Sequence, residues 1–202
     1  MVNETVHAYD LDAAAYVEAG SQLSDSVRAD IEDFAARLGD GARVLEIGSG
    51  GGRDARLMEE LGLAVRRTDI TLGFVTLLRE QGHIADVLDP LVDDLSSSEG
   101  PYDGVWANAS LLHVARADLR TVLSRLVDVT RPGGLLRASF KEGDGEGWST
   151  HGAISNPRHF TYWRAPALAR VATEARWTGV SVGHGLMGKR DETWARLAGV
   201  RG

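Results

Sequence analysis

A glycine-rich turn carries the clearest chemical signal in the sequence. An apolar run ends in Glu46-x-Gly48-x-Gly50-x-Gly52, and glycines at this spacing let a ligand lie directly on the backbone. A dinucleotide-binding turn would place its third glycine at position 53, where Arg53 stands, and a phosphate-binding P-loop would end in Gly-Lys-Ser or Gly-Lys-Thr. Neither pattern is present, whereas a carboxylate stands two residues before the first glycine. The turn therefore favours a cationic ligand over one that carries a pyrophosphate.

A second carboxylate, Asp69, follows the next apolar run and stands 21 residues after Gly48. A carboxylate at the end of a strand can accept hydrogen bonds from both hydroxyls of a ribose, and each such bond contributes about 1.5–3 kcal/mol. Asp69 could instead cap the N-terminus of the helix expected after it. The two roles are compatible, and the spacing from the glycine turn favours ribose binding.

His113 is the first candidate for a catalytic base. It lies in the segment 108–114, directly after a predicted strand, and a histidine titrates close to neutral pH. Such a side chain could remove a proton from a reacting group. The alternative is a histidine that only packs beside the site, and the sequence leaves both interpretations open. His151 and His159 are weaker candidates for the same role.

The connection 141–164 is long and rich in glycine, aromatic and charged residues. Long connections at the carboxyl end of a strand often form lids or substrate-binding walls. We therefore expect this segment to face the substrate through Lys141, Trp148, Arg158 and Tyr162. Lys141 and Arg158 could bind an anionic group such as a carboxylate. Lys141 could instead pair with a neighbouring glutamate, Arg158 could lie on the surface, and the aromatic residues could anchor the segment to the core.

Short apolar runs alternate with helical patterns along the chain. The predicted strands are 43–48, 64–69, 83–87, 102–108, 135–140, 180–185 and 193–200. The predicted helices are 54–61, 74–81, 118–130 and 165–176. Repeated strand–helix–strand units imply an α/β fold with a doubly wound parallel sheet. Ligands bind such sheets at the carboxyl ends of the strands, which is where the glycine turn, Asp69 and His113 stand.

The segment before about position 40 has an amphipathic helical pattern. Its apolar residues at helical spacing are Leu23, Val27, Ile31, Phe34, Ala35 and Leu38, and Tyr9 and Tyr16 precede them. This N-terminal helical cap, residues 1–40, could cover a face of the sheet or form a flap over the bound ligand.

The composition places limits on function. The chain has 202 residues, of which 43% are hydrophobic and 25% charged, so we expect a single domain spanning 1–202. The formal net charge of −7 disfavours nucleic acid as a partner. No apolar stretch is long enough to span a membrane and the segment 1–5 is unlike a signal peptide, so we expect a cytoplasmic protein without a membrane partner. With no cysteine and no closely spaced histidine pair, we expect no metal site.

Together these motifs resemble those of class I S-adenosylmethionine-dependent methyltransferases, in particular the small bacterial enzymes of the group that includes ubiquinone-biosynthesis and tellurite-resistance methyltransferases. The resemblance runs from about Tyr9 to the C-terminus. It is reinforced by Thr68-Asp69, Ala85-Asp86, the segment 102–108 and Arg131-Pro132-Gly133-Gly134. It implies a single Rossmann-like domain with a seven-stranded, mostly parallel sheet in the order 3-2-1-4-5-7-6.

The resemblance also implies roles for individual residues toward S-adenosylmethionine. The implied contacts are Glu46, Gly48, Gly50 and Gly52 with the methionine part, Asp69 with the ribose, Asp86 and Val87 with the adenine, and Ala107 and Asn108 beside the sulfonium. Ser49, Ile70 and Ala109 complete the expected cofactor-binding set. One departure from the family pattern is Gly52-Arg53-Asp54, where many members have other residues. An acid at Asp54 suits the start of a helix in any case.

We expect an enzyme that transfers a methyl group from S-adenosylmethionine to an oxygen or nitrogen of a small-molecule acceptor by in-line displacement. The alternatives are a metalloid methyltransferase of the tellurite type and a non-catalytic S-adenosylmethionine-binding protein. A nicotinamide-dependent enzyme would need a Tyr-x-x-x-Lys pair, but Pro166 stands four residues after Tyr162. The sequence leaves the acceptor open, and the protein could act as a monomer or a homodimer.

Overall fold

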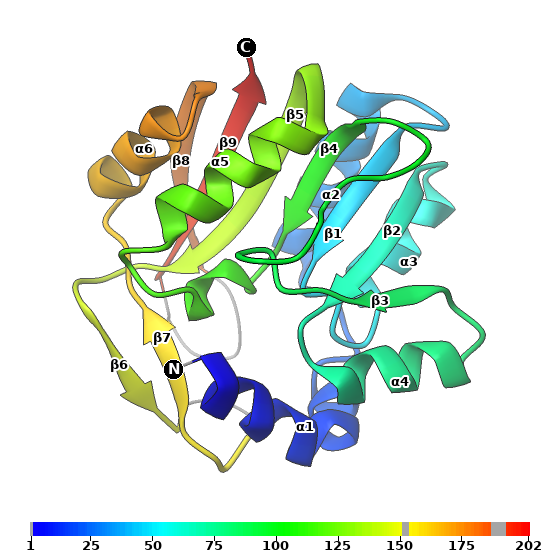
Figure 1. Cartoon of the computed structure of the whole chain (residues 1–202), viewed down its shortest axis with the longest axis vertical. Helices are drawn as coiled ribbons and strands as arrows, with labels where there is room; N and C mark the ends of the chain where they lie inside the picture. The colour runs from blue at the N-terminus through cyan, green and yellow to red at the C-terminus, as the bar shows by residue number, and fades with distance from the viewer. Residues whose placement is uncertain (1, 151–153, 187–192) are drawn as a thin grey trace.

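The computed structural model describes residues 2–150, 154–186 and 193–202, and its centre is a seven-stranded sheet with helices on both faces (Figure 1). The strands are β1 (Arg43–Ile47), β2 (Ala64–Asp69), β3 (Ala85–Val87), β4 (Tyr102–Ala107), β5 (Thr130–Lys141), β6 (Glu146–Ser149), β7 (Arg158–Thr161), β8 (Trp177–Leu186) and β9 (Thr193–Arg201). The helices are α1 (Val2–Ala19), α2 (Asp25–Leu38), α3 (Arg53–Glu60), α4 (Leu72–Glu80), the short 3₁₀ helix η1 (Leu111–His113), α5 (Leu119–Val129) and α6 (Ala165–Glu174).

The sheet has the strand order β3-β2-β1-β4-β5-β9-β8. The first five strands in this order pair in parallel, while β9 lies antiparallel to both β5 and β8. Because β6 and β7 form a separate two-stranded sheet, counting only the strands of the large sheet gives the predicted order 3-2-1-4-5-7-6. The predicted Rossmann-like α/β fold is confirmed.

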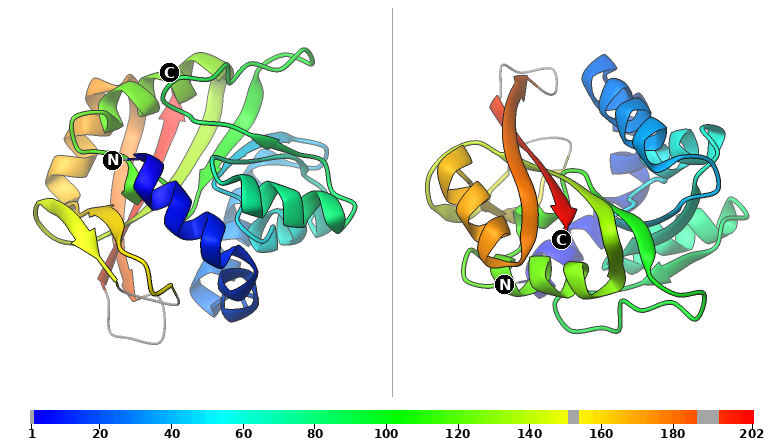
Figure 2. Two further views of the ribbon diagram at one scale, coloured as in Figure 1. Left: turned by 60° about the horizontal axis from the view of Figure 1, so that its bottom comes forward. Right: turned by 90° about the horizontal axis from the view of Figure 1, so that it is seen from above.

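Two pairs of helices cover the faces of the sheet (Figure 2). On one face α2 buries Val27, Ile31 and Phe34, whose spacing forms a stripe along the helix, and packs with α3 against the sheet. Ser24 begins α2 as its N-cap, because its side chain accepts a hydrogen bond from the backbone N–H of Val27. On the other face α5 and α6 bury leucine, valine and alanine side chains in the largest hydrophobic core.

The N-terminal segment forms two helices with different positions. Whereas α2 packs on a face of the sheet, α1 lies across the end of the sheet at which β1 and β4 terminate (Figure 1). The helix α1 contains a kink at Asp12, where the backbone has φ −117° and ψ 16°. The Asp10 side chain accepts a hydrogen bond from the backbone N–H of Gly73, 2.7 Å away, and so ties α1 to the first turn of α4.

The connection that was expected to be a long loop contains a β-hairpin. β6 and β7 pair antiparallel, from Glu146 with Thr161 to Ser149 with Arg158. All four residues of β7 are buried, so this strand lacks the apolar–polar alternation by which a strand is recognised in a sequence. His151 lies outside the described residues.

Candidate active site

A cavity of about 240 Å³ lies at the carboxyl ends of β1, β2 and β4, beneath α1. This position is the one expected for a ligand site in a doubly wound sheet. The cavity brings together nine of the predicted site residues: Glu46, Gly48, Ser49, Gly50, Asp69, Ile70, Asn108, Ala109 and His113.

The glycine turn is shaped by close contacts. The backbone N–H of Gly48 donates to the carbonyl oxygen of Thr68 over 2.9 Å, and its φ is +79°. A Cβ atom on Gly48 would lie 2.3 Å from the Cβ of Ser110, so only glycine fits there. Gly52 has φ +72° and a Cβ there would meet Leu78 at 2.6 Å. Gly52 lies outside the cavity lining and lets α3 begin against α4, and its contact with a ligand stays a prediction.

Glu46 is a buried acid in the wall of the cavity. It is 2% exposed, and its Oε2 accepts a hydrogen bond from the hydroxyl of Ser49, which in turn accepts from the backbone N–H of Thr68. Burial, together with the nearby carboxylate of Asp54, raises the pKa of Glu46 to about 8. A cation in the cavity would favour the ionised form of Glu46 and would itself be stabilised by it.

Asp69 uses both carboxylate oxygens to hold the neighbouring turns. Its Oδ2 accepts from the backbone N–H of Gly50 at 2.9 Å, and its Oδ1 accepts from that of Thr71 at 2.8 Å. Thr71, not Asp69, occupies the N-cap position of α4. Burial raises the pKa of Asp69, and its backbone hydrogen bonds oppose this effect. A carboxylate has about four acceptor positions, so Asp69 can still accept hydrogen bonds from a ligand.

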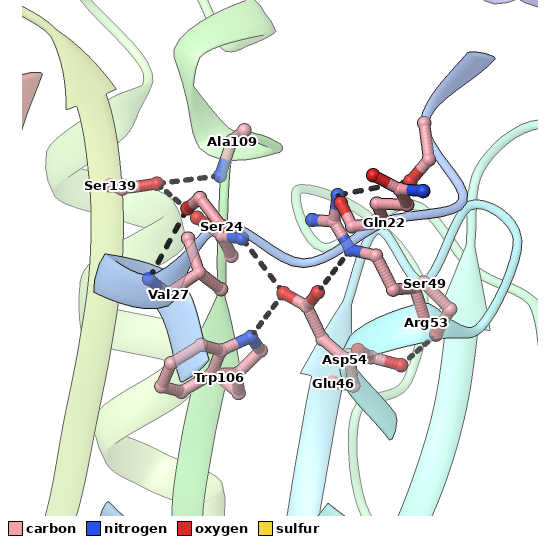
Figure 3. Close-up of polar contacts among 12 residues, drawn as sticks. Gln22, Ser24, Val27, Glu46, Ser49, Arg53, Asp54, Trp106, Ala109 and Ser139 are labelled. Atoms are coloured by element: carbon pink, nitrogen blue, oxygen red, sulfur yellow. Dashed lines mark hydrogen bonds and ion pairs between the residues drawn. The ribbon is translucent and has the colours of Figure 1, made fainter. Parts of the chain in front are cut away.

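Asp54 is the centre of the polar network in Figure 3. Its Oδ2 accepts from Trp106 Nε1 at 3.0 Å and from Asn108 Nδ2 at 2.8 Å, while its Oδ1 accepts from Arg53 Nε at 2.9 Å. The sequence analysis gave Asp54 only a favourable place at the start of a helix. Its position directly after the glycine turn was the one local indication of a role in the site. The network itself could not be predicted, because Trp106 and Asn108 come from a distant part of the chain.

A strained turn follows β4. Ala109 has φ +53°, in the left-handed region that costs an L-residue about 1–2 kcal/mol. Ser139 holds this turn, because its Oγ accepts from the Ala109 N–H at 2.8 Å and donates to Asn108 Oδ1 at 2.6 Å. The Asn108 amide therefore bonds to the protein at both ends, to Ser139 through its oxygen and to Asp54 through its nitrogen. A ligand in the cavity meets Asn108 in one fixed orientation.

His113 is buried against α1. Its Nε2 lies 2.9 Å from the hydroxyl oxygen of Tyr9, and its Nδ1 lies 2.6 Å from the carbonyl oxygen of His159. Burial lowers the pKa of His113 to about 4. Arg158 donates to the Tyr9 hydroxyl over 3.3 Å. Tyr9 could not be recognised as a site residue from the sequence, because only the tertiary position of α1 brings it to His113.

The predicted adenine-binding pair lies at the edge of this region. Asp86 and Val87 are in neither cavity lining, and the carboxylate of Asp86 accepts from Arg66 Nε at 2.9 Å. Leu88, the next residue, does line a second cavity of about 80 Å³. This cavity adjoins the first, because both are lined by Gly48, Ile70, Ser110 and His113.

The four predicted substrate contacts lie behind or beside the cavity, not in its lining. Arg158 is 3% exposed, so it is not a surface residue. Lys141 Nζ lies 4.9 Å from the ring centre of Phe160, and Trp148 is 43% exposed on the hairpin. Tyr162 uses its backbone N–H to bond to Gly145 and is only partly buried. Arg158 reaches a side chain of the cavity through Tyr9, and the charge of Lys141 acts on His113.

Comparison with known proteins finds a family model that matches the central part of the chain. A family model described as a methyltransferase domain matches residues 45–138, which run from β1 to the middle of β5 and include the glycine turn, Asp54, Asp69 and His113. No curated protein matches this chain in sequence.

Solved structures share the fold of this chain over nearly its whole length. A Burkholderia thailandensis 1,6-didemethyltoxoflavin-N1-methyltransferase, crystallised with 1,6-didemethyltoxoflavin and S-adenosylhomocysteine, has a TM-score of 0.74 at 22% identity and covers 98% of this chain and 89% of its own. The CcbJ methyltransferase from Streptomyces caelestis has a TM-score of 0.71 at 17% identity, with 98% and 99% covered. A magnesium protoporphyrin IX methyltransferase from Synechocystis, with bound S-adenosylhomocysteine, has a TM-score of 0.71 at 14% identity, with 100% of both chains covered.

Within residues 2–150, 154–186 and 193–202, no helix has the length and apolar character needed to cross a membrane. Over the same ranges, no three histidine, aspartate or glutamate side chains are grouped so that they could hold a metal ion.

Proposed function

We propose that the protein transfers a methyl group from S-adenosylmethionine to an oxygen or nitrogen atom of a small molecule. The observation that carries this proposal is a single cavity in which the carboxylates of Glu46, Asp54 and Asp69 surround the bare backbone of Gly48 and Gly50. S-adenosylmethionine fits this chemistry, since it carries an ammonium group and a sulfonium but no phosphate. A pyrophosphate-bearing ligand would be repelled by negative charge on Asp54 and Asp69.

The two adjoining cavities suggest how the cofactor would be held. Glu46 lines the larger cavity and would accept from the ammonium group, while Asp69 would accept from the ribose hydroxyls. The smaller cavity has an apolar wall that includes Ile70 and Leu88 and would take the adenine. Asp86 and Val87 stand next to Leu88 in the chain and stay candidates for contacts with the adenine edge.

The chain's own contribution to the reaction is positioning and the exclusion of water. S-adenosylmethionine, when bound, supplies a methyl group that is activated by the positive sulfonium. The helix α1 covers the cavity through Tyr9 and Tyr16, which keeps water from the reacting atoms. Asn108 and Ala109 are fixed by Ser139 and would hold the reacting end in one orientation.

The acceptor side of the site is formed by α1, η1 and the hairpin. Methyltransferases with a similar fold are named for molecules as different as 1,6-didemethyltoxoflavin and magnesium protoporphyrin IX. The shared fold therefore does not identify the acceptor. Lys141, Trp148 and Tyr162 stay candidates for the outer part of the acceptor site, and Arg158 is a candidate through its contact with Tyr9. A cytoplasmic location and a monomeric or dimeric state also remain part of this proposal.

Calorimetric titration with S-adenosylhomocysteine tests the proposal directly. We expect the wild type to bind it, the Asp69→Asn variant to bind at least about tenfold more weakly because hydrogen bonds to a charged acceptor are lost, and NAD not to bind. The matched control is Glu60→Gln, an exposed acid on α3, which should leave the affinity unchanged. Binding of NAD without binding of S-adenosylhomocysteine would overturn the proposal.

A further inference from the structure

The direction of the hydrogen bond between Tyr9 and His113 can be deduced from the partners of His113. The Nδ1 atom of His113 lies 2.6 Å from the carbonyl oxygen of His159. A carbonyl oxygen can only accept, so Nδ1 carries the hydrogen of the neutral imidazole and Nε2 carries a lone pair. Because Nε2 lies 2.9 Å from the Tyr9 oxygen, the Tyr9 hydroxyl must donate to it.

The surroundings of His113 keep its ring neutral. The side chain is buried, and the positive charges of Arg158 and Lys141 as well as the ring of His159 act against protonation. The hydrogen bond to the His159 backbone acts in the other direction and raises the pKa of His113. In a protonated His113 the Nε2–H would instead donate to the Tyr9 oxygen, and the burial of the ring beside two cationic side chains disfavours this form.

Arg158 fixes the other side of the Tyr9 hydroxyl. Its Nη1 donates to the Tyr9 oxygen over 3.3 Å, and its guanidinium carbon lies 5.3 Å from the centre of the Tyr9 ring. The single hydrogen of Tyr9 is therefore committed to His113, while a cation stands beside its oxygen. Tyr9 lines the cavity, and what its hydroxyl can offer a molecule there is lone-pair density.

We propose that Tyr9 binds the methyl acceptor as a hydrogen-bond acceptor, and that the reacting atom of the acceptor therefore carries a hydrogen of its own, as a hydroxyl or an N–H. This inference rests on the proposed methyltransferase function and specifies its substrate class. A carbonyl oxygen, a tertiary amine or a thioether has no hydrogen to donate to Tyr9 and is excluded.

The same three side chains provide a path for the proton. The acceptor atom forms a bond to the methyl carbon with its lone pair, the carbon–sulfur bond breaks, and its electron pair stays on sulfur. The proton of the acceptor passes to the Tyr9 oxygen as the Tyr9 proton passes to His113 Nε2, so the positive charge of the sulfonium ends on the imidazole. The Arg158 guanidinium stabilises negative charge on the Tyr9 oxygen during this transfer.

The path to His113 matters most for acceptors that become strong acids when they are methylated. A hydroxyl, or an amide or ring N–H, gives such a product and would pass its proton along this path. A neutral alkylamine would not need the path, because its methylated product is stable as an alkylammonium and can leave with its proton.

The first test is the tautomer of His113, measured by nuclear magnetic resonance on full-length protein labelled with ¹⁵N in its histidines. We expect His113 with hydrogen on Nδ1 and an unprotonated Nε2 whose signal shifts when Tyr9→Phe removes the hydroxyl. The control is Tyr16→Phe, which removes a hydroxyl from a neighbouring ring, 5.2 Å away between centroids, and should leave the signal in place. A hydrogen on Nε2 in the wild type would reverse the bond and overturn the proposal.

The second test asks whether the acceptor site prefers a hydrogen-bond donor. It compares the affinities of phenol, whose oxygen carries a hydrogen, and anisole, whose oxygen does not. Both are titrated into protein saturated with S-adenosylhomocysteine. We expect the wild type to prefer phenol by about fivefold, the value of one hydrogen bond, and Tyr9→Phe to lose this preference. Equal affinities in the wild type, including no measurable binding of either probe, would overturn the proposal, as would a preference that survives Tyr9→Phe.

These tests separate the two proposals. Failure of S-adenosylhomocysteine to bind would refute the methyltransferase function before any probe is added. Normal binding of S-adenosylhomocysteine, with the wrong tautomer or without the preference for phenol, would refute only the assignment of Tyr9.

Discussion

Asn108 donates its side-chain amide to Asp54 over 2.8 Å, and this bond joins the turn after β4 to the first turn of α3. Trp106, two residues earlier, donates its indole N–H to the same carboxylate oxygen over 3.0 Å. Asp54 therefore sets the distance between two of the loops that form the cavity. A change at this residue should affect both the stability of the fold and the shape of the site.

We expect Asp54→Ala to destabilise the protein by about 2–4 kcal/mol, because the buried indole N–H of Trp106 and the amide of Asn108 lose their acceptor. Urea unfolding followed by circular dichroism measures this loss. The matched control is Glu60→Ala, which removes an exposed acid from the same helix and should change the free energy of unfolding by less than about 0.5 kcal/mol. Similar losses for the two variants would contradict the central role of Asp54.

The architecture could be predicted from the sequence because local patterns decide it. The apolar runs of β1, β2 and β4 and the helical spacing in α5 are visible residue by residue, and parallel strands joined by helices allow few arrangements. The glycine turn and Asp69 could be placed in the site for a similar reason. Each directly follows a strand, and the carboxyl ends of parallel strands meet at one edge of the sheet.

The acceptor side could not be predicted, because it is built from contacts distant in the sequence. Tyr9 and His113 are separated by 104 positions, and nothing local to α1 shows that it crosses the end of the sheet. The sequence left Arg158 either facing an anionic substrate group or on the surface, whereas β7 is buried under α1 and holds its guanidinium beside Tyr9. A charged residue is usually exposed, but it can be buried where tertiary packing supplies it with a partner.

Two glycines of the same turn should respond differently to alanine. Both have positive φ, +79° at Gly48 and +51° at Gly50, so each substitution pays about 1–2 kcal/mol for backbone strain. At Gly48 the new Cβ would also lie 2.3 Å from Ser110, whereas at Gly50 no atom lies within 4 Å. We therefore expect Gly48→Ala to lower the urea midpoint clearly more than Gly50→Ala. Equal midpoints would show that the turn can move away from Ser110.

The attachment of α2 to the sheet should depend on Arg137. This arginine has a 9% exposed side chain in β5, and its guanidinium lies 3.3 Å from Asp30 and 2.8 Å from Asp33. We expect Arg137→Met to cost about 2–3 kcal/mol, because Asp30 is largely buried and loses its counter-charge. Asp33→Ala should cost at most about 1 kcal/mol, since its side chain is 57% exposed. Urea unfolding of both variants tests this, and a larger loss for Asp33→Ala would contradict the assignment.

Glu46 should make the ligand-free protein less stable as pH rises. Its pKa is raised from 4.5 to about 8 by burial, so the folded state binds a proton that the unfolded state has released over this range. Its contribution to stability is complete below pH 4.5 and is lost as pH rises through 8. The buried His113 has the opposite sign, because its lowered pKa removes stability as pH falls from 6.5 toward 4. Above pH 6.5 the pH dependence of stability therefore reports on Glu46 without the opposing effect of His113.

The free energy of unfolding, measured by urea titration from pH 6.5 to 8.5, should fall by up to about 1.4 kcal/mol per pH unit in the wild type. In Glu46→Gln, which keeps the shape of the neutral side chain, this fall should be clearly smaller, whereas Glu60→Gln should follow the wild type. Parallel curves for wild type and Glu46→Gln would mean that Glu46 is ionised in the empty cavity. In that case the cation that the cavity is shaped to bind would meet a preformed anion, and its binding would release no proton from this side chain.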